Sequence, residues 1–184
     1  MTALILYATP TGALADACDR YFAACQGLAP TTAQTYPPHC TLTGFFHRPA
    51  ERVAEVVAEV QGLIDHAGPV PARAVANTGL RCDDDWVGFE LQSDWLQERT
   101  AEVTAVHRLH PGDDALRPKS WLHLSLAYGV DDLAPYRRLA IEHGLDHPPP
   151  GGWEVALWTR SASGAWNRLT TEPDQPPIDR SDRP

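Results

Sequence analysis

Two short segments of the sequence each place a histidine two positions before a hydroxyl-bearing residue. They are His39-Cys40-Thr41-Leu42 and His123-Leu124-Ser125-Leu126. Both lie in apolar stretches typical of β-strands, in which side chains alternate between two faces. We therefore expect each histidine to share a strand face with its hydroxyl neighbour, while the apolar residues beside them point into the core.

Two imidazoles and two hydroxyls suit the transfer of a phosphoryl group. Such a reaction needs a base for the attacking oxygen and an acid for the departing one, and histidine titrates near enough to neutral pH for either role. The hydroxyls of Thr41 and Ser125 can donate hydrogen bonds to the non-bridging phosphoryl oxygens. We expect His39 and His123 to be the acid and the base, in an order that the sequence leaves open. The residues thus favour a metal-free phosphodiester hydrolase.

A zinc site is less favoured by the same residues. Two histidines fall short of the usual three protein ligands of catalytic zinc, and no Asp, Glu or Cys shares the two strand faces. The bare pattern is itself weak, since about one His-x-Ser/Thr would arise by chance in a chain of this composition. The pattern becomes informative because its two copies lie at matching positions of the two sequence halves. Two structural histidines, each hydrogen-bonded by a neighbouring hydroxyl, remain the alternative.

The elements that must position these residues occur twice. Apolar periodicity predicts helices over residues 12–28, 51–66, 93–110 and 132–143, and strands over 3–9, 39–46, 70–81, 86–92, 121–130, 153–160 and 165–170. The order strand, helix, loop, strand, helix, strand pair starts at residue 3 and again at residue 86.

This repetition predicts an α+β fold of two pseudo-symmetric lobes. Each lobe would be an antiparallel sheet with helices on its outer face, and the active-site cleft would lie centrally between them. We expect one bilobal domain over residues 1–171, with a first repeat of about 3–81 and a second of about 86–170. The polar, proline-rich tail at 172–184 is expected to be disordered.

Composition argues against several classes of partner. Fifteen basic and 24 acidic residues give a formal net charge of −9, which disfavours a long nucleic acid. A small anionic substrate remains compatible, because a local group of residues can override net charge. No apolar run approaches the ~20 residues of a membrane helix, and the first apolar run is too short for a signal peptide. We expect a cytoplasmic monomer with no membrane partner.

The paired tetrapeptides, about 84 residues apart, resemble the motifs of the 2H phosphoesterase superfamily. The stretch WLHLSLAYG, at 121–129, is most similar to the cyclic phosphodiesterase branch, which opens 2′,3′-cyclic nucleotides or ADP-ribose 1″,2″-cyclic phosphate. The resemblance implies a bilobal α+β fold and catalysis without a metal or other cofactor. It also implies that His39, Thr41, His123 and Ser125 are the catalytic four. The product of a 2′,3′-cyclic nucleotide would be the 2′-phosphate.

The same branch has a tyrosine five residues after its second motif histidine, which corresponds to Tyr128. Strict alternation along the strand would place Tyr128 on the core face. The match therefore requires a twist or a bulge before Gly129.

Other residues near the motifs could bind the rest of a nucleotide. Tyr36 and Trp121 could stack on a base, although aromatic residues that anchor a core or a loop are equally expected there. Thr43 and Phe45 continue the face of the first motif and could line the cleft. Lys119 precedes the second motif, where it could attract phosphate or be a solvated loop charge.

Two further alternatives stay open for the function. The same site could act on RNA ends or cyclic oligonucleotides, although the acidic composition disfavours long RNA. The protein could also be a nucleotide-binding module without catalysis, although binding alone would not need two proton-transfer groups.

Overall fold

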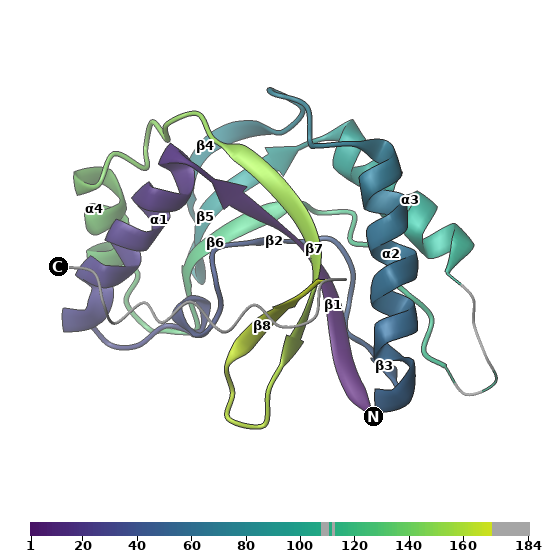
Figure 1. The fold of residues 1–184 in the computed structure, drawn as a ribbon. Helices are drawn as coiled ribbons and strands as arrows, with labels where there is room; N and C mark the ends of the chain where they lie inside the picture. Colours follow the sequence, from purple (N-terminus) through teal and green to yellow (C-terminus); the bar gives the residue numbers. More distant parts are fainter. Residues whose placement is uncertain (108–110, 112, 171–184) are drawn as a thin grey trace, which may run out of the picture.

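The computed structural model describes residues 1–107, 111 and 113–170. Within this part of the chain, eight strands form one open antiparallel sheet in the order β4-β5-β6-β2-β1-β7-β8, and β3 pairs with β1 (Figure 1). The strands are β1 (Thr2–Thr11), β2 (Cys40–Thr41), β3 (Phe46–Arg48), β4 (Ala76–Cys82), β5 (Trp86–Gln92), β6 (His123–Tyr128), β7 (Gly152–Arg160) and β8 (Trp166–Leu169). The predicted disordered tail at 172–184 lies outside the described residues.

Four α-helices accompany the sheet in the described residues: α1 (Ala13–Ala24), α2 (Val53–Ala67), α3 (Asp94–Val106) and α4 (Ala134–Glu142). They form two pairs, α1 beside α4 and α2 beside α3 (Figure 1). Their starts and ends follow local chemistry. The hydroxyl of Ser93 accepts a hydrogen bond from the amide of Leu96 (3.1 Å), as its predicted capping role requires. Gly68 and Gly144 end α2 and α4 with positive φ angles of 77° and 72°.

The helices and one face of the sheet enclose a single hydrophobic core. Strand β1 sends Leu4, Leu6 and Ala8 into this core, where apolar residues of all four helices meet them. The alternate residues Ile5 and Tyr7 are also buried, on the opposite face of the sheet. A central strand covered on both faces is expected to be this uniformly apolar.

The sheet differs from the predicted arrangement of one separate sheet per lobe. Strands of both sequence halves belong to the same sheet, and β2 and β6, which carry the two motifs, are neighbours near its middle. The last strand of the first half, β4, pairs with β5 of the second half, while β7 of the second half pairs with β1 of the first. Strands of each sequence half therefore pair with strands of the other half within one sheet.

One predicted strand, 39–46, is interrupted. Strands β2 and β3 are separate because the chain between them leaves regular pairing. The amide of Leu6 donates a hydrogen bond to the Thr43 hydroxyl (3.1 Å), so a side chain takes the place of a strand carbonyl here. Of the predicted strand at 70–81, only the part from residue 76 is a strand. None of the helices in the described ranges has the length and apolar character needed to cross a membrane.

Candidate active site

The two motifs lie side by side on neighbouring strands. Cys40 of β2 pairs with Leu124 of β6, and both side chains are fully buried in the core. In this antiparallel register the histidine of each motif lies opposite the hydroxyl residue of the other. The two histidines are diagonal neighbours, a relation that separates Cα atoms by about 7–8 Å and leaves space between the rings for a small group.

A cavity of about 540 Å³ opens over this face of the sheet. Six of the residues predicted from the sequence line it: His39, Thr41, Trp121, His123, Ser125 and Tyr128. Its remaining lining residues were not predicted: Ala33, Pro37, Asp85, Trp86 and Gly129. Both motif histidines therefore line the same cavity.

Each imidazole is held by a main-chain carbonyl two residues earlier in the chain. The Nδ1 atom of His39 lies 2.8 Å from the carbonyl oxygen of Pro37. The Nδ1 atom of His123 lies 3.3 Å from the carbonyl oxygen of Trp121. A neutral imidazole that donates from Nδ1 carries its free lone pair on Nε2. Both rings therefore keep Nε2 for the exchange of a proton with a ligand.

An aromatic ring also packs against each imidazole. Tyr7, which reaches the site from β1, has its ring centroid 3.9 Å from that of His39. Trp121 stacks on His123 with the same centroid distance of 3.9 Å and an interplanar angle of 25°. These contacts restrict the orientation of both rings. The sequence did not indicate that Tyr7 packs against His39, because Tyr7 lies in an apolar run typical of a buried strand.

Burial makes both imidazoles weak bases. It lowers the pKa of His39 to about 4, with a smaller contribution from His123. The pKa of His123 is also lowered, mainly by burial and further by the positive charge of Lys119, while the carboxylate of Glu90 acts in the opposite direction. Both rings are therefore mostly neutral at pH 7 in the unliganded protein.

The hydroxyl of Ser125 is oriented by an unpredicted neighbour. The Nε1–H group of Trp86 donates a hydrogen bond to the Ser125 oxygen (2.9 Å). Since the oxygen already accepts this bond, the hydroxyl hydrogen is available to donate to a ligand. Thr41 lines the same cavity opposite His123, so two hydroxyls accompany the two imidazoles.

A bulge in β6 explains how Tyr128 reaches the cavity. Ala127 pairs with Val87 and Ser125 pairs with Gly88, so Leu126 between them has no partner on β5. The extra residue reverses the alternation after Leu126. Leu126 and Ala127 are both fully buried in the core, and Tyr128 lines the cavity. This is the bulge that the resemblance required. Burial also raises the pKa of the Tyr128 phenol, so it is neutral.

Four other predicted substrate-binding residues lie outside the lining of this cavity. The prediction for Thr43 is wrong, because its side chain is fully buried and bonded to the Leu6 amide. Phe45 is 40% exposed and packs on Trp166. Tyr36 contacts His39 and Trp166 at centroid distances of 5.5 and 4.9 Å. Lys119 is exposed, and its positive charge contributes to lowering the pKa of His123.

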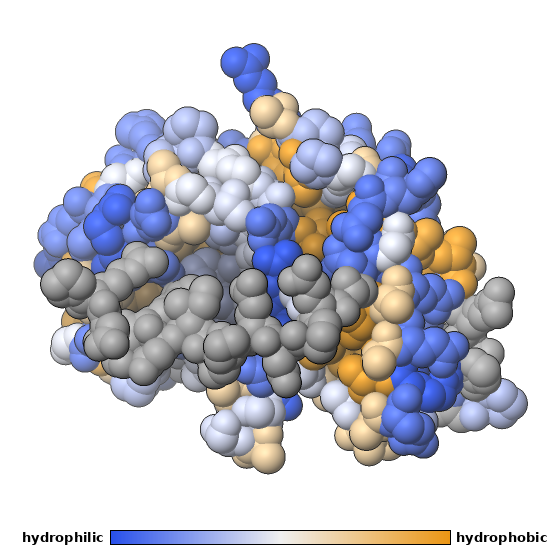
Figure 2. All heavy atoms as spheres, in the orientation of Figure 1, coloured by the Kyte–Doolittle hydropathy of each residue, from blue (hydrophilic) through white to orange (hydrophobic). Residues whose placement is uncertain are grey.

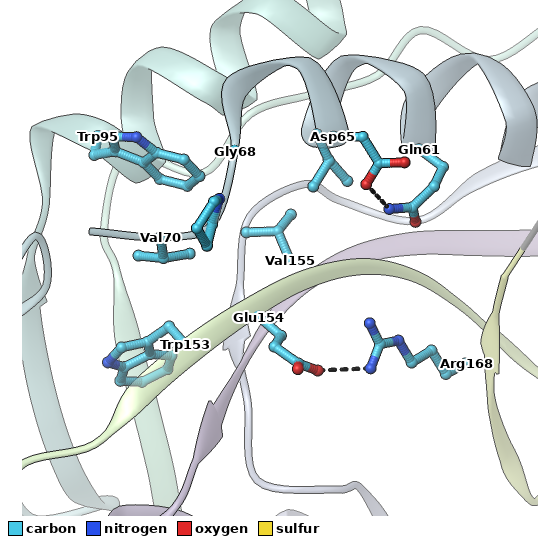
Figure 3. A pocket seen from close by; sticks show the side chains of 11 residues that line it. Gln61, Asp65, Gly68, Val70, Trp95, Trp153, Glu154, Val155 and Arg168 are labelled. Atoms are coloured by element: carbon cyan, nitrogen blue, oxygen red, sulfur yellow. Dashed lines mark hydrogen bonds and ion pairs between the residues drawn. The ribbon is translucent and has the colours of Figure 1, made fainter. Parts of the chain in front are cut away.

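A second, smaller cavity of about 320 Å³ lies between α2 and the strands β7 and β8 (Figure 3). Hydrophobic residues line the hollow between α2 and β7 in the space-filling view (Figure 2). Its charged and polar groups already bind one another: Glu154 pairs with Arg168 (2.6 Å), and Gln61 donates to Asp65 (2.7 Å). No histidine is among its described lining residues, so it offers no comparable proton-transfer group.

No family model matches the chain, and no curated protein sequence matches it. Among the residues that the structure describes, no three His, Cys, Asp or Glu side chains are grouped so that they could hold a metal ion. What the site offers chemically is two neutral imidazoles with free Nε2 atoms, two hydroxyl donors and a phenol around one cavity.

Proposed function

We propose that this protein is a metal-independent cyclic phosphodiesterase of the 2H phosphoesterase superfamily. Its substrate would be a small cyclic phosphodiester, either a 2′,3′-cyclic nucleotide or ADP-ribose 1″,2″-cyclic phosphate. One observation carries the proposal: His39 and His123 line a single cavity, and each has its Nδ1 atom on a main-chain carbonyl so that Nε2 is left for chemistry.

In the proposed reaction, one imidazole accepts a proton from water as the water oxygen forms a bond to phosphorus. The bond between phosphorus and one ribose oxygen breaks, and the other imidazole donates a proton to that oxygen. Thr41 and Ser125 donate hydrogen bonds to the non-bridging oxygens, where negative charge lies in the transition state. Tyr128 lies on the same cavity wall and can bind the phosphate or the ribose.

The surroundings of the two imidazoles suggest which is the base. His39 is the more strongly perturbed ring and is kept unprotonated by burial, as a general base must be. His123 lies opposite Glu90 in the sheet, and the carboxylate of Glu90 favours its protonated form. We assign His39 as the base that activates water and His123 as the acid that protonates the ribose oxygen.

We also propose that the molecule is built from two pseudo-symmetric lobes. The strand order supports this, since β2 and β6 are flanked by β1 and β5, and these in turn by β7 and β4. The helix pairs α1–α4 and α2–α3 would then cover the two lobes.

The decisive experiment is hydrolysis of 2′,3′-cyclic nucleotides in EDTA by the wild type, His39→Ala and His123→Ala. Each substitution should lower kcat by about 10²–10⁴-fold, the usual contribution of acid–base catalysis. His66→Ala, at an exposed position of α2, is the matched control and should keep full activity. A strict requirement for Zn²⁺ or Mn²⁺, or tight nucleotide binding without turnover, would contradict the proposal.

A further inference from the structure

The cavity extends mainly in one direction from the two histidines. Towards the start of β6 its lining continues only to Trp121, which is 48% exposed. Towards the end of β6 it continues along Tyr128 and Gly129, with Asp85 and Trp86 on the neighbouring strand end. A substrate with its phosphorus between the imidazoles must therefore place the rest of its body at the Tyr128 end.

Asp85 is the charged side chain at that end. It directly precedes Trp86, which pairs with Tyr128. Its neighbour Asp83 is bound to Arg81 (3.2 Å), and Arg81 also holds Glu90 (2.5 Å). Among the described residues no ion pair engages Asp85.

No lysine or arginine is among the described residues that line the cavity. Lys119 lies beyond the opposite end, where its amide donates to the carbonyl of Leu42 (2.8 Å). The hydroxyl donors and a protonated histidine can therefore stabilise the charge of one phosphodiester, and the described lining offers no lysine or arginine to a second phosphate. A phosphate at the Tyr128 end would also meet the carboxylate of Asp85.

We infer that Asp85 makes this cavity specific for a 2′,3′-cyclic mononucleotide with a free 5′-hydroxyl and excludes substrates with a phosphate at the 5′ position. A 5′-hydroxyl is neutral and can donate a hydrogen bond to a carboxylate, whereas a 5′-phosphate adds negative charge where the wall is already negative. ADP-ribose 1″,2″-cyclic phosphate and the cyclic-phosphate ends of RNA both carry a 5′-phosphate. This inference rests on the proposed function and narrows its substrate.

The test compares adenosine 2′,3′-cyclic phosphate with its 5′-phosphorylated form, a pair that differs in one group. For the wild type, kcat/KM should be at least about tenfold higher for the 5′-hydroxyl substrate, the scale of one like-charge repulsion at a partly wet site. Asp85→Asn should bring the two values close together, mainly by improving use of the phosphorylated substrate. Asp84→Asn, at an exposed neighbour outside the lining, should leave the ratio unchanged.

Salt provides an independent readout. The Debye length falls from about 10 Å at 0.1 M to about 3 Å at 1 M, so salt should reduce the wild-type preference and have little effect on that of Asp85→Asn. Equal use of both substrates, or a preference for the phosphorylated one, would overturn the inference and leave the proposed function standing. If the wild type hydrolyses neither substrate, the proposed function fails and the inference fails with it.

Discussion

The two imidazoles are held in the same way but differ in what surrounds them. His39 has the ring of Tyr7 packed against it and is the more strongly perturbed of the two. His123 lies between Trp121 and the edge of Trp86, with the carboxylate of Glu90 on the neighbouring strand. Near-identical motifs in the sequence thus receive different acid–base properties from residues that the motifs do not contain.

This asymmetry predicts an acidic optimum for kcat/KM, which reports the free enzyme. A base is active when unprotonated, so activity should rise as pH increases through the His39 pKa of about 4. An acid is active when protonated, so activity should fall as pH increases through the His123 pKa, which lies below its ordinary 6.5. Two unperturbed histidines would instead place both limbs near neutral pH. Initial rates at low substrate concentration between about pH 3.5 and 8.5 measure this profile.

The profile of kcat provides a comparison for the same prediction. A bound phosphodiester anion favours the protonated form of both imidazoles, so both limbs of the kcat profile should lie at higher pH than those of kcat/KM. An optimum of kcat/KM above pH 7 would contradict the assigned environments.

At the scale of elements, the junction of β5 and β6 determines the shape of the cavity wall. The β6 bulge turns Tyr128 into the cavity, and Gly88 lies where the register shifts. A Cβ atom at Gly88 would overlap the carbonyl oxygen of Leu124 and the ring of Trp86. Glycine at this position therefore lets Trp86 lie close enough to bond Ser125.

Gly88→Ala should damage both stability and activity. Overpacking against a main-chain carbonyl costs about 1–3 kcal/mol of unfolding free energy, and displacement of Trp86 should lower kcat by releasing the Ser125 hydroxyl. Urea denaturation and turnover of a 2′,3′-cyclic nucleotide measure the two effects.

Gly62→Ala is the matched control for this substitution. A Cβ at Gly62, inside α2, would meet no atom within 4 Å. This variant should gain about 0.5–1 kcal/mol from the higher helix propensity of alanine, with unchanged activity. A Gly88→Ala variant as stable as the wild type would contradict the prediction, because β5 and β6 would then have shifted to accommodate the added Cβ atom.

The sequence predicted the helices and most strands because their apolar residues repeat with clear periods. It also predicted the faces of the motif strands, where period-two alternation holds over the few residues involved. Alternation failed at Thr43, whose side chain replaces a strand carbonyl, and past Leu126, where one residue is unpaired. Both exceptions depend on a partner strand, so the local pattern does not reveal them.

At the scale of the whole molecule, the site depends on strands that are distant in the sequence. Tyr7 comes from β1, while Trp86 and Asp85 come from the start of β5 and the turn before it. The order of strands within a sheet could not be predicted from the local pattern, so these residues could not be assigned to the site. The buried ion pair of Arg48 and Asp113 (3.3 Å) was unpredicted for the same reason.

The pairing of strands across the two halves predicts that neither half folds alone. A fragment of residues 1–84 lacks β5, the partner of β4, and β7, a partner of β1. A fragment of residues 85–184 lacks β1 and β2, the strands that lie between β6 and the β7–β8 hairpin in the sheet. Each fragment should show little cooperative thermal unfolding by circular dichroism, and an equimolar mixture should recover the spectrum of the intact chain. A cooperative transition in either isolated fragment would contradict this prediction.

The use of main-chain carbonyls to hold both imidazoles affects how the protein tolerates mutation. In many enzymes a carboxylate side chain fixes the catalytic histidine, and one substitution removes it. Here the acceptors belong to the peptide units of Pro37 and Trp121, so replacement of either side chain leaves the acceptor atom in the chain. Substitution of Pro37 or Trp121 should therefore leave the Nδ1–H tautomer of the neighbouring histidine unchanged, even where it alters the packing around the ring.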